Sequence, residues 1–330
     1  MDSSPAPTDA ASVADRARRQ ELRGDELAAS LRAVPDLTAI DLSGADLTGA
    51  DLSGLTLFKA NLSNARLSEA SLEGTELSGS TLAGAHLERA KLARAGLGMA
   101  DLSDANAFEA DLSHATLTGA NLSGAVFHLA DLSGARIREA DLTKADFRSA
   151  TLKDAELSLC EVAGSSFDEA DLRGSRLRAV HGYESATWYG VDIRDINFSG
   201  AYRLRRHVVD ENYLREFREA GSLEAALYKF WWLTSDCGRS LSRWVLNIAV
   251  VVLIFAGLFA MAGVETGIHD TGLMTHVYFS VVTLTTLGYG DILPNSSLGQ
   301  ILVILEVCIG YVMLGGLISI LANKMARRAE

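Results

Sequence analysis

A five-residue period constrains this 330-residue chain more than any other feature. From Leu37 to Leu177 every fifth residue is apolar, 29 positions in one unbroken register, and only Ala107 among them is small. Five residues advance about 500° on an α-helix, which would spread the apolar positions over every face. On a strand an odd period alternates between the two faces. The chain must therefore turn once per repeat, which predicts a polygonal coil with apolar side chains inside.

The other positions of the repeat are also regular. Alanine occupies every fifth position from 85 to 155, two residues before each large apolar residue, and the residue between them is frequently Asp or Asn. This pattern, Ala-(Asp/Asn)-Leu-x-x, resembles the pentapeptide-repeat family. The resemblance implies a right-handed quadrilateral β-helix with four repeats per coil. Residues 36–200 would then form a β-solenoid of about eight coils, roughly 40 Å long at ~4.8 Å per coil.

The repeat ends with an irregularity. The register slips by one residue near His181 and resumes at Trp188, Ile193 and Phe198. A bulge at one corner explains the slip, and bulky aromatic residues suit a closing coil.

Charge is concentrated in the solenoid. The chain has a formal net charge of −12, and residues 36–200 hold 25 Asp and Glu against 14 Lys and Arg, a net of −11. This acidity argues against nucleic acid as a partner. Some pentapeptide-repeat proteins are acidic rods that mimic DNA, but here the acidic positions follow from the repeat pattern. A spacer, scaffold or regulatory domain, open to an unknown cytosolic ligand or protein, is the favoured interpretation.

Residues 1–35 precede the repeats. They are expected to begin disordered and then to form one helix, from Ser12 to Ala33, which caps the exposed first coil. A basic membrane-surface helix is the alternative, although the apolar face is small. No basic-then-apolar signal peptide is present at the start, which favours a cytosolic position for this part of the chain.

Residues 201–243 are expected to be a helical linker. A basic cluster at Arg205 and its neighbours ends the solenoid, and a helix from Val208 to Ala220 follows. A second helix, over 222–235, has one apolar face and two tryptophans, which favours an amphipathic helix at the inner membrane surface. A rigid linker packed on the solenoid is the alternative.

Residues 244–326 predict an all-α membrane domain with two spans. Trp244 to Ala262 carries no charge, and Leu298 to Ala322 is interrupted only by Glu306, so each run can cross a ~30 Å apolar core. A short helix from about Leu273 to Thr285 lies between the spans, after an acidic turret (Glu265, His269, Asp270). The loop between the spans lacks Lys and Arg, which flank the opposite ends instead. Both termini are therefore expected in the cytoplasm, with the protein in the cell (inner) membrane. The flanking basic residues are Arg239, Arg243, Lys324, Arg327 and Arg328.

A Gly-Tyr-Gly sequence follows the short helix. Two glycines flanking a tyrosine allow dihedral angles that let successive carbonyl groups point the same way. A row of inward carbonyl oxygens can replace the water shell of a monovalent cation. The segment resembles the potassium-channel filter, Thr-Val-Gly-Tyr-Gly followed by Asp, with Leu287 in place of valine. The resemblance implies that K+ ions, and no organic cofactor, bind at Thr285, Thr286, Leu287, Gly288, Tyr289 and Gly290.

The same resemblance suggests roles outside the filter. Asp291 is expected to tether the filter to the pore helix through Tyr278. Val282 stands where some bacterial relatives have glutamate, so their inactivation behaviour does not transfer. Gly310, 19 residues after Asp291, occupies the family's hinge position, with Gly315 as a second flexible point; close packing is the alternative for Gly310. The expected cavity-lining residues are Tyr311, Leu314, Ile318 and Ala322.

Glu306 is the one acidic residue inside the predicted spans. Acidic residues at membrane depth are functional candidates by default. Glu306 can pair behind the pore helix or be protonated, and the sequence does not choose between the two.

These features predict a tetrameric, potassium-selective channel that conducts K+ passively. One chain supplies one filter loop and the family's filter needs four, so a homotetramer in the lipid bilayer is expected. An enzyme is disfavoured, because no catalytic triad, phosphate loop or carboxylate pair stands out from the repeats. Neither span has a ladder of arginines, so no voltage sensor is predicted. The alternative is a membrane-anchored scaffold that binds a cytosolic partner through the solenoid and has a non-conducting pore.

Overall fold

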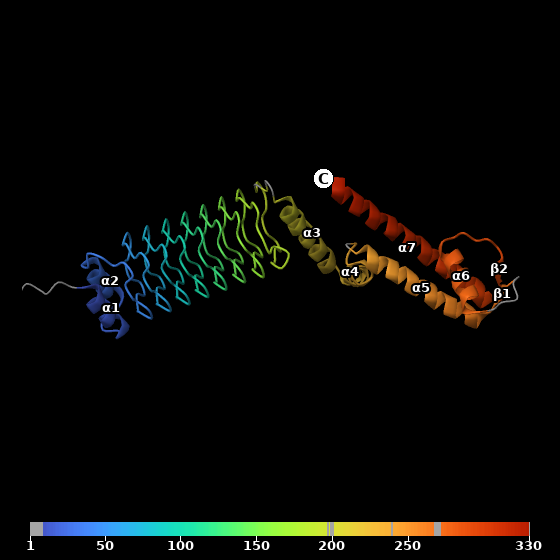
Figure 1. The fold of residues 1–330 in the computed structure, drawn as a ribbon, viewed down its shortest axis with the longest axis horizontal. Helices are drawn as coiled ribbons and strands as arrows, with labels where there is room; N and C mark the ends of the chain where they lie inside the picture. Colours follow the sequence, from blue (N-terminus) through green and yellow to red (C-terminus); the bar gives the residue numbers. More distant parts are fainter. Residues whose placement is uncertain (1–8, 197, 199–200, 239, 267–271, 330) are drawn as a thin grey trace, which may run out of the picture. The chain divides into compact units, whose positions relative to one another are not determined.

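The computed structural model describes residues 9–196, 198, 201–238, 240–266 and 272–329. The chain divides into two compact units, residues 1–215 and 216–330. The first is a stack of coils with helices at its two ends, and the second is helical (Figure 1).

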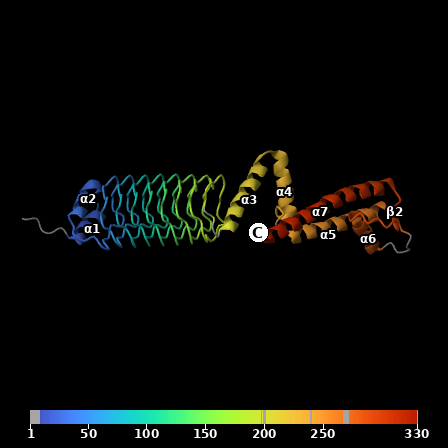
Figure 2. The same cartoon turned by 90° about the horizontal axis from the view of Figure 1, so that it is seen from above.

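The coils of the first unit repeat every 20 residues. Parallel β-bridges join residues 20 apart without a gap, from Asp41–Asn61 to Glu161–His181. Four pentapeptides therefore make one coil, and the coils lie directly above one another (Figures 1 and 2). The quadrilateral β-helix implied by the repeat pattern is the observed fold.

A β-turn forms each corner of the coil. The Ala45 N–H donates to the Leu42 carbonyl at 3.0 Å, and the same bond recurs in the pentapeptides that follow. The last residue of the repeat, two positions after the inward leucine, has a left-handed backbone, with φ of +66° at Gly44 and +57° at Lys59. Between corners, Ala and Leu point inward and the residue between them points outward.

The interior of the solenoid is almost completely closed to solvent. Its leucines at every fifth position from Leu37 to Leu177 are 0–5% exposed. In the later coils one column of the interior changes to aromatic residues, with rings stacked nearly parallel at centroid distances of 5.0, 5.1 and 4.5 Å. The column consists of Phe127, Phe147, Phe167 and Trp188. Each coil thus buries its apolar side chains only against its neighbours.

The predicted slip of register is present. Bridges after Glu161–His181 join residues 21 apart, at Ser166–Thr187 and Asp171–Asp192. The extra residue lies between His181 and Thr187, and Trp188 returns to the aromatic column.

The amino-terminal cap differs from the single helix that was predicted. Two helices form, α1 (Ala10–Arg18) and α2 (Gly24–Arg32). The chain turns between them through Gln20, whose φ is +57°, and Leu22 is buried in the turn. Breaking the helix lets both short helices place their apolar faces on the first coil, in the same core as the solenoid. The prediction of one continuous helix was wrong, whereas the predicted capping of the first coil is observed.

The other end of the solenoid is also covered by a helix. α3 spans Tyr202–Glu219, so it begins six residues before the predicted Val208 and includes the basic cluster in its first turn. Leu204 and Val208 are buried in the solenoid core. Asn212 donates to the Trp188 carbonyl and accepts from the Gly190 N–H, each at 2.8 Å. The early start is therefore set by contacts with the last coil.

The second unit contains four helices and one strand pair in its described part. α4 (Ser222–Ser235) and α5 (Leu241–Ala262) are followed by α6 (Leu273–Leu284), which was expected to be a pore helix, and by α7 (Ser297–Ala329). β1 (Val264–Thr266) pairs antiparallel with β2 (Ile292–Pro294). By length and composition, Leu241–Ala262 and Ser297–Ala322 can each cross a membrane. α4 has the bounds expected from the sequence, and α6 ends one residue before the expected Thr285.

Candidate functional site

The candidate site is the segment that continues α6, residues 285–291. The pore helix ends at Leu284, and the N–H groups of Thr286 and Leu287 still bond back to it, reaching the carbonyls of Thr283 and Val282 at 3.0 Å. The Thr285 hydroxyl also donates back, to the Val281 carbonyl at 2.6 Å. The start of the segment is therefore anchored to the helix through its donors.

The backbone of the segment alternates in the sign of φ. Thr286, Gly288 and Gly290 have φ of +57°, +51° and +74°, while Leu287 and Tyr289 between them are not left-handed. Such alternation directs successive carbonyl groups to one side of the chain. Among the described residues, no recorded hydrogen bond uses the carbonyl oxygens of 286–290. Within the described part of the chain these oxygens are left without a hydrogen-bond donor.

Tyr278 and Asp291 brace the outer end of the segment. The Tyr278 hydroxyl donates to Asp291 Oδ2 at 2.8 Å, so the structure brings together the two residues expected to tether the filter to the pore helix. Val282, where some relatives have glutamate, is buried. A hydroxyl–carboxylate bond and apolar packing thus both support this segment.

Glu306 lies behind the pore helix. Its side chain is fully buried, and its Oε1 contacts the Ser280 hydroxyl. The Ser280 hydroxyl also contacts the Val252 carbonyl at 3.0 Å. A serine has one hydrogen to donate, and a carbonyl oxygen cannot donate. The serine can share its hydrogen between both acceptors, or a protonated Glu306 can donate to Ser280 while Ser280 donates to the Val252 carbonyl. Pairing and protonation, left open by the sequence, are therefore compatible here.

Sequence reasoning gave no role to Ser280 or Trp244. Ser280 joins α6 to both α5 and α7, and its signal was a small polar residue within a buried apolar helix. The Trp244 indole N–H donates to the Met313 carbonyl at 2.8 Å, which joins α5 to α7. A Cβ added at Gly316 would overlap the Trp244 ring, so close packing against Trp244 explains the glycine at this position.

Gly310 and Gly315 have different surroundings. Gly310 is buried, and an added Cβ would overlap the Leu284 carbonyl oxygen at the end of the pore helix. At Gly315 an added Cβ would meet no atom within 4 Å. The helix α7 continues through both positions without a break. In this conformation Gly310 allows α7 to pack closely on α6, and the hinge remains a prediction.

The four residues expected to line the cavity are all exposed in the single chain. Tyr311, Leu314 and Ile318 are 64%, 47% and 61% exposed, and Ala322 is exposed as well. Leu287 and Tyr289, in the segment after α6, are also exposed. Large apolar side chains left uncovered beside a filter segment point to further contacts outside one chain.

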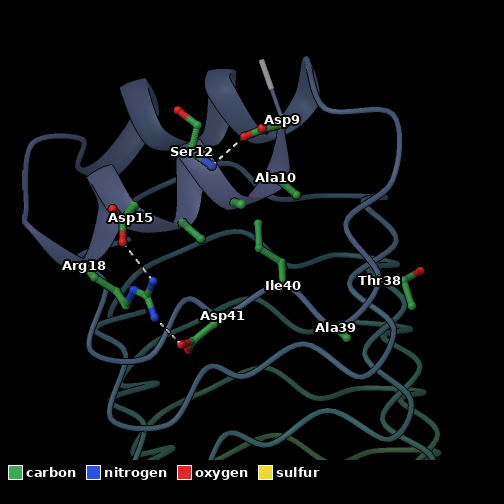
Figure 3. A pocket seen from close by; sticks show the side chains of 11 residues that line it. Asp9, Ala10, Ser12, Asp15, Arg18, Thr38, Ala39, Ile40 and Asp41 are labelled. Atoms are coloured by element: carbon green, nitrogen blue, oxygen red, sulfur yellow. Dashed lines mark hydrogen bonds and ion pairs between the residues drawn. The ribbon is translucent and has the colours of Figure 1, made fainter. Parts of the chain in front are cut away.

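A cavity of about 620 Å³ lies between α1 and the first coil (Figure 3). Arg18 crosses from α1 to donate to Asp41 at 2.6 Å and also bonds Asp15 at 3.0 Å. Hydrogen bonds from Ser43, together with the charge of Arg18, hold the pKa of Asp41 below its ordinary value. These charged groups already bond one another and hold α1 on the coil, so the cavity is a weaker candidate than the filter segment.

Several predicted features lie outside the described residues. They are the positions His269 and Asp270 of the turret, the side chain of Glu265, the basic residue Arg239, and the side chains of Lys324, Arg327 and Arg328. Arg243 is described, and its guanidinium lies 3.9 Å from the Asp236 carboxylate.

Comparisons with known proteins match both parts of the chain. Residues 247–327 match the ion channel family. Residues 36–106 and 108–178 match pentapeptide repeats, in eight copies. The chain joins a pentapeptide-repeat domain to a potassium-channel pore domain.

The chain is similar to curated potassium channels. It is 34% identical over 97 residues to Two-pore potassium channel 1 of Arabidopsis thaliana, and 35% identical over 76 residues to Probable potassium channel protein 2 of Methanocaldococcus jannaschii. These matches cover 29% and 23% of this chain, and 27% and 22% of the relatives. The chain thus spans about a quarter of the length of these relatives.

The solenoid is similar to solved pentapeptide-repeat structures. QnrB1, a plasmid-mediated fluoroquinolone resistance protein, matches 52% of this chain and 96% of its own at 21% identity and a TM-score of 0.44. A pentapeptide repeat protein from the Arabidopsis thaliana thylakoid lumen matches 31% of this chain and 70% of its own at 31% identity and a TM-score of 0.30.

Proposed function

We propose that the protein is a homotetrameric, potassium-selective channel that conducts K+ passively across the cell membrane. The observation that carries the proposal is the row of free carbonyl oxygens at 286–290, on a backbone of alternating φ between two membrane-spanning helices. Carbonyl oxygens presented by four chains around one axis can replace the hydration shell of K+. No organic cofactor is needed, since the ion itself is the cargo.

Two further observations support this proposal. The pore helix ends at the filter, and the partly negative carboxyl end of a helix favours a cation. The exposed residues of α7, Tyr311, Leu314 and Ile318, would line the cavity, while lipid and neighbouring subunits would cover the other exposed apolar side chains of α5 and α7. Both termini are proposed to lie in the cytoplasm, with α4 at the inner surface of the membrane. The solenoid then has a regulatory or assembly role, towards an unknown cytosolic ligand or protein and not nucleic acid.

Flux through liposomes tests the proposal. The purified chain should pass K+ and far less Na+. Gly290→Ala should lose the K+ flux, because φ of +74° at this position is unfavourable for a residue with a Cβ. Gly257→Ala in α5 is the matched control, since a Cβ there meets no atom within 4 Å. Equal permeability to K+ and Na+, or flux that survives Gly290→Ala unchanged, would contradict a filter at 286–290.

The role of the solenoid needs a separate comparison. The full chain and a chain beginning at Ser222 are recorded side by side in planar bilayers. A change in opening after the deletion indicates regulation, and a change in yield alone indicates assembly. A full chain that binds a cytosolic protein but passes no ion at any potential would favour the scaffold alternative.

A further inference from the structure

The four sides of the solenoid do not carry the same charge. Each coil from 41 to 180 contributes one pentapeptide to each side, and the first side (41–45 and every twentieth residue onward) carries five acidic residues and one basic residue. The second and third sides carry seven acidic against three basic, and six against four. The fourth side (56–60 and every twentieth residue onward) is the exception, with three acidic and five basic residues. One side is therefore positive on an otherwise acidic rod.

The basic residues of the fourth side gather in the later coils. Arg138 has ion-pair contacts with Glu139 and Glu156 at 3.4 and 3.7 Å, and Arg176 lies 3.9 Å from Glu156. All of these guanidinium groups are well exposed. For Arg136 and Arg178 no ion pair is recorded within the described part of the chain. The cluster thus keeps positive charge that its own chain does not neutralise.

The fourth side is also the most apolar on its outside. Four large apolar residues of the described coils between 41 and 180 are exposed, and three of them, Phe58, Met99 and Leu159, belong to this side. Met99 is 80% exposed. Most of the other outward residues of this side in its pentapeptides at 76–80, 96–100 and 116–120 are small, which lets another molecule approach the backbone there; they include Ser78, Gly79, Gly96, Gly98, Thr116, Thr118 and Gly119. Exposed apolar residues beside positive charge indicate a contact surface.

Fourfold symmetry gives a four-sided rod a specific way to use such a surface. When four square rods pack around one axis, each rod touches two neighbours, one through each of two adjacent sides. At every contact the first of these two sides on one rod meets the second of them on the next rod. Such an interface is heterologous and closes into a ring. The first and third sides are both adjacent to the fourth. Of these two, the first side has the larger net negative charge, with five acidic residues and one basic against six and four. Under rotation about an axis parallel to the rods, facing residues stay at the same height.

We propose that the four solenoids of the tetramer pack side by side, with the fourth side of each against the first side of the next copy. This rests on the tetramer of the proposed function. Arg136 and Arg138 then face the level of Asp141 on the neighbouring rod, while Met99 is covered by the same contact. Attraction between opposite charges would set which sides meet, and burial of the apolar residues would add affinity.

Disulfide cross-linking of the full chain in membranes tests the packing. Cys237 and Cys308 are replaced by serine; Cys160 stays, because it is fully buried and burial raises the pKa of its thiol to about 12. Arg136→Cys and Asp141→Cys, the outward residues of the fourth and first sides, are introduced together. Oxidation should give a ladder from dimer to covalent tetramer. Either cysteine alone should give no ladder, because a heterologous contact does not bring like positions together.

A matched pair of cysteines controls for chance collisions between chains and for a disulfide formed within one chain. Asp146→Cys with Thr151→Cys has the same spacing on the second and third sides, which face outward in this packing, and should give no ladder. Glu156→Cys with Glu161→Cys repeats the test pair one coil further on and should give the ladder again.

Two readouts on the same samples separate this proposal from the proposed function. The mass of the detergent-solubilised complex reports the tetramer, and liposome flux reports conduction. Conducting tetramers without a ladder from either test pair, or with an equal ladder from the control pair, would overturn the packing and leave the channel intact. Chains that neither assemble, conduct nor cross-link would overturn both.

Discussion

The solenoid and the pore unit bury apolar residues in opposite ways. In the solenoid the inward side chains are removed from solvent inside one chain, with most of the leucines at 0% exposure. In the pore unit only 22% and 17% of the most apolar 18-residue stretches of α5 and α7 are buried. The hydrophobic effect can therefore stabilise the solenoid in water as a single chain. The pore helices need lipid and other subunits to cover them.

The two units also place polar groups differently. Inside the solenoid, isolated small groups donate to the preceding coil, as Ser80 does to the Leu57 carbonyl at 2.7 Å. In the pore unit, buried polar contacts join separate helices, as Ser280 does for α5, α6 and α7. The solenoid thus repeats one local pattern of burial and hydrogen bonding, whereas the pore unit depends on a few specific contacts between helices. Substitutions in each unit can sharpen or break this contrast.

The largest effect is expected at the contact between α6 and α7. Gly310→Ala should abolish K+ flux and reduce the yield of tetramer, because its Cβ would overlap the Leu284 carbonyl at the base of the filter. Gly315→Ala, with open space around its Cβ, should assemble and conduct. Flux and complex mass are measured for both variants. A Gly310→Ala protein that assembles normally and changes only its opening would instead support the hinge.

The extent to which the sequence predicted these features follows from the same contrast. The solenoid was predictable because its rule is local: Leu37 and Leu177 obey the same five-residue pattern. The ends of the solenoid were not, because the break between α1 and α2 and the early start of α3 at Tyr202 depend on contacts with the terminal coils. The segment 285–291 was singled out from its residues, and its role as a filter stays a prediction. The pairing of Glu306 with Ser280 was not, since it depends on how three helices cross.

A smaller, local effect is expected inside the solenoid. Phe147→Ala removes the ring between Phe127 and Phe167 and should lower the free energy of unfolding by about 3–5 kcal/mol. Since each coil contacts only its neighbours, hydrogen exchange should accelerate in the adjoining coils first. Phe108→Ala is the matched control, because that ring lies outside the coil against His128, and it should change stability by less than about 0.5 kcal/mol. Uniform acceleration along the whole solenoid would contradict nearest-neighbour stabilisation.

A still smaller effect is expected for the buried acid of the pore unit. Glu306→Gln should assemble and conduct like the original chain, because its amide can donate to Ser280 while Ser280 donates to Val252. Glu306→Ala leaves the serine without this partner and should lower the thermal stability of the tetramer, by about 1–3 kcal/mol per chain. A Gln variant as impaired as the Ala variant would show that the carboxylate charge itself is required.

The smallest effect is expected on the outer surface of the solenoid. Asp131 Oδ1 accepts from the Ser133 N–H at 2.9 Å, and Asn121 makes the equivalent bond to the Ser123 N–H at 3.1 Å. Asp131→Asn should therefore leave the free energy of unfolding unchanged, and Asp131→Ala should lower it by about 0.5–1.5 kcal/mol. Denaturant unfolding of the two variants measures the difference. Equal losses of stability in the two variants would mean that the charge of Asp131, rather than its hydrogen bond to the turn, stabilises this corner. The contrast with the pore unit, where the specific bond is expected to matter more than the charge, would then weaken.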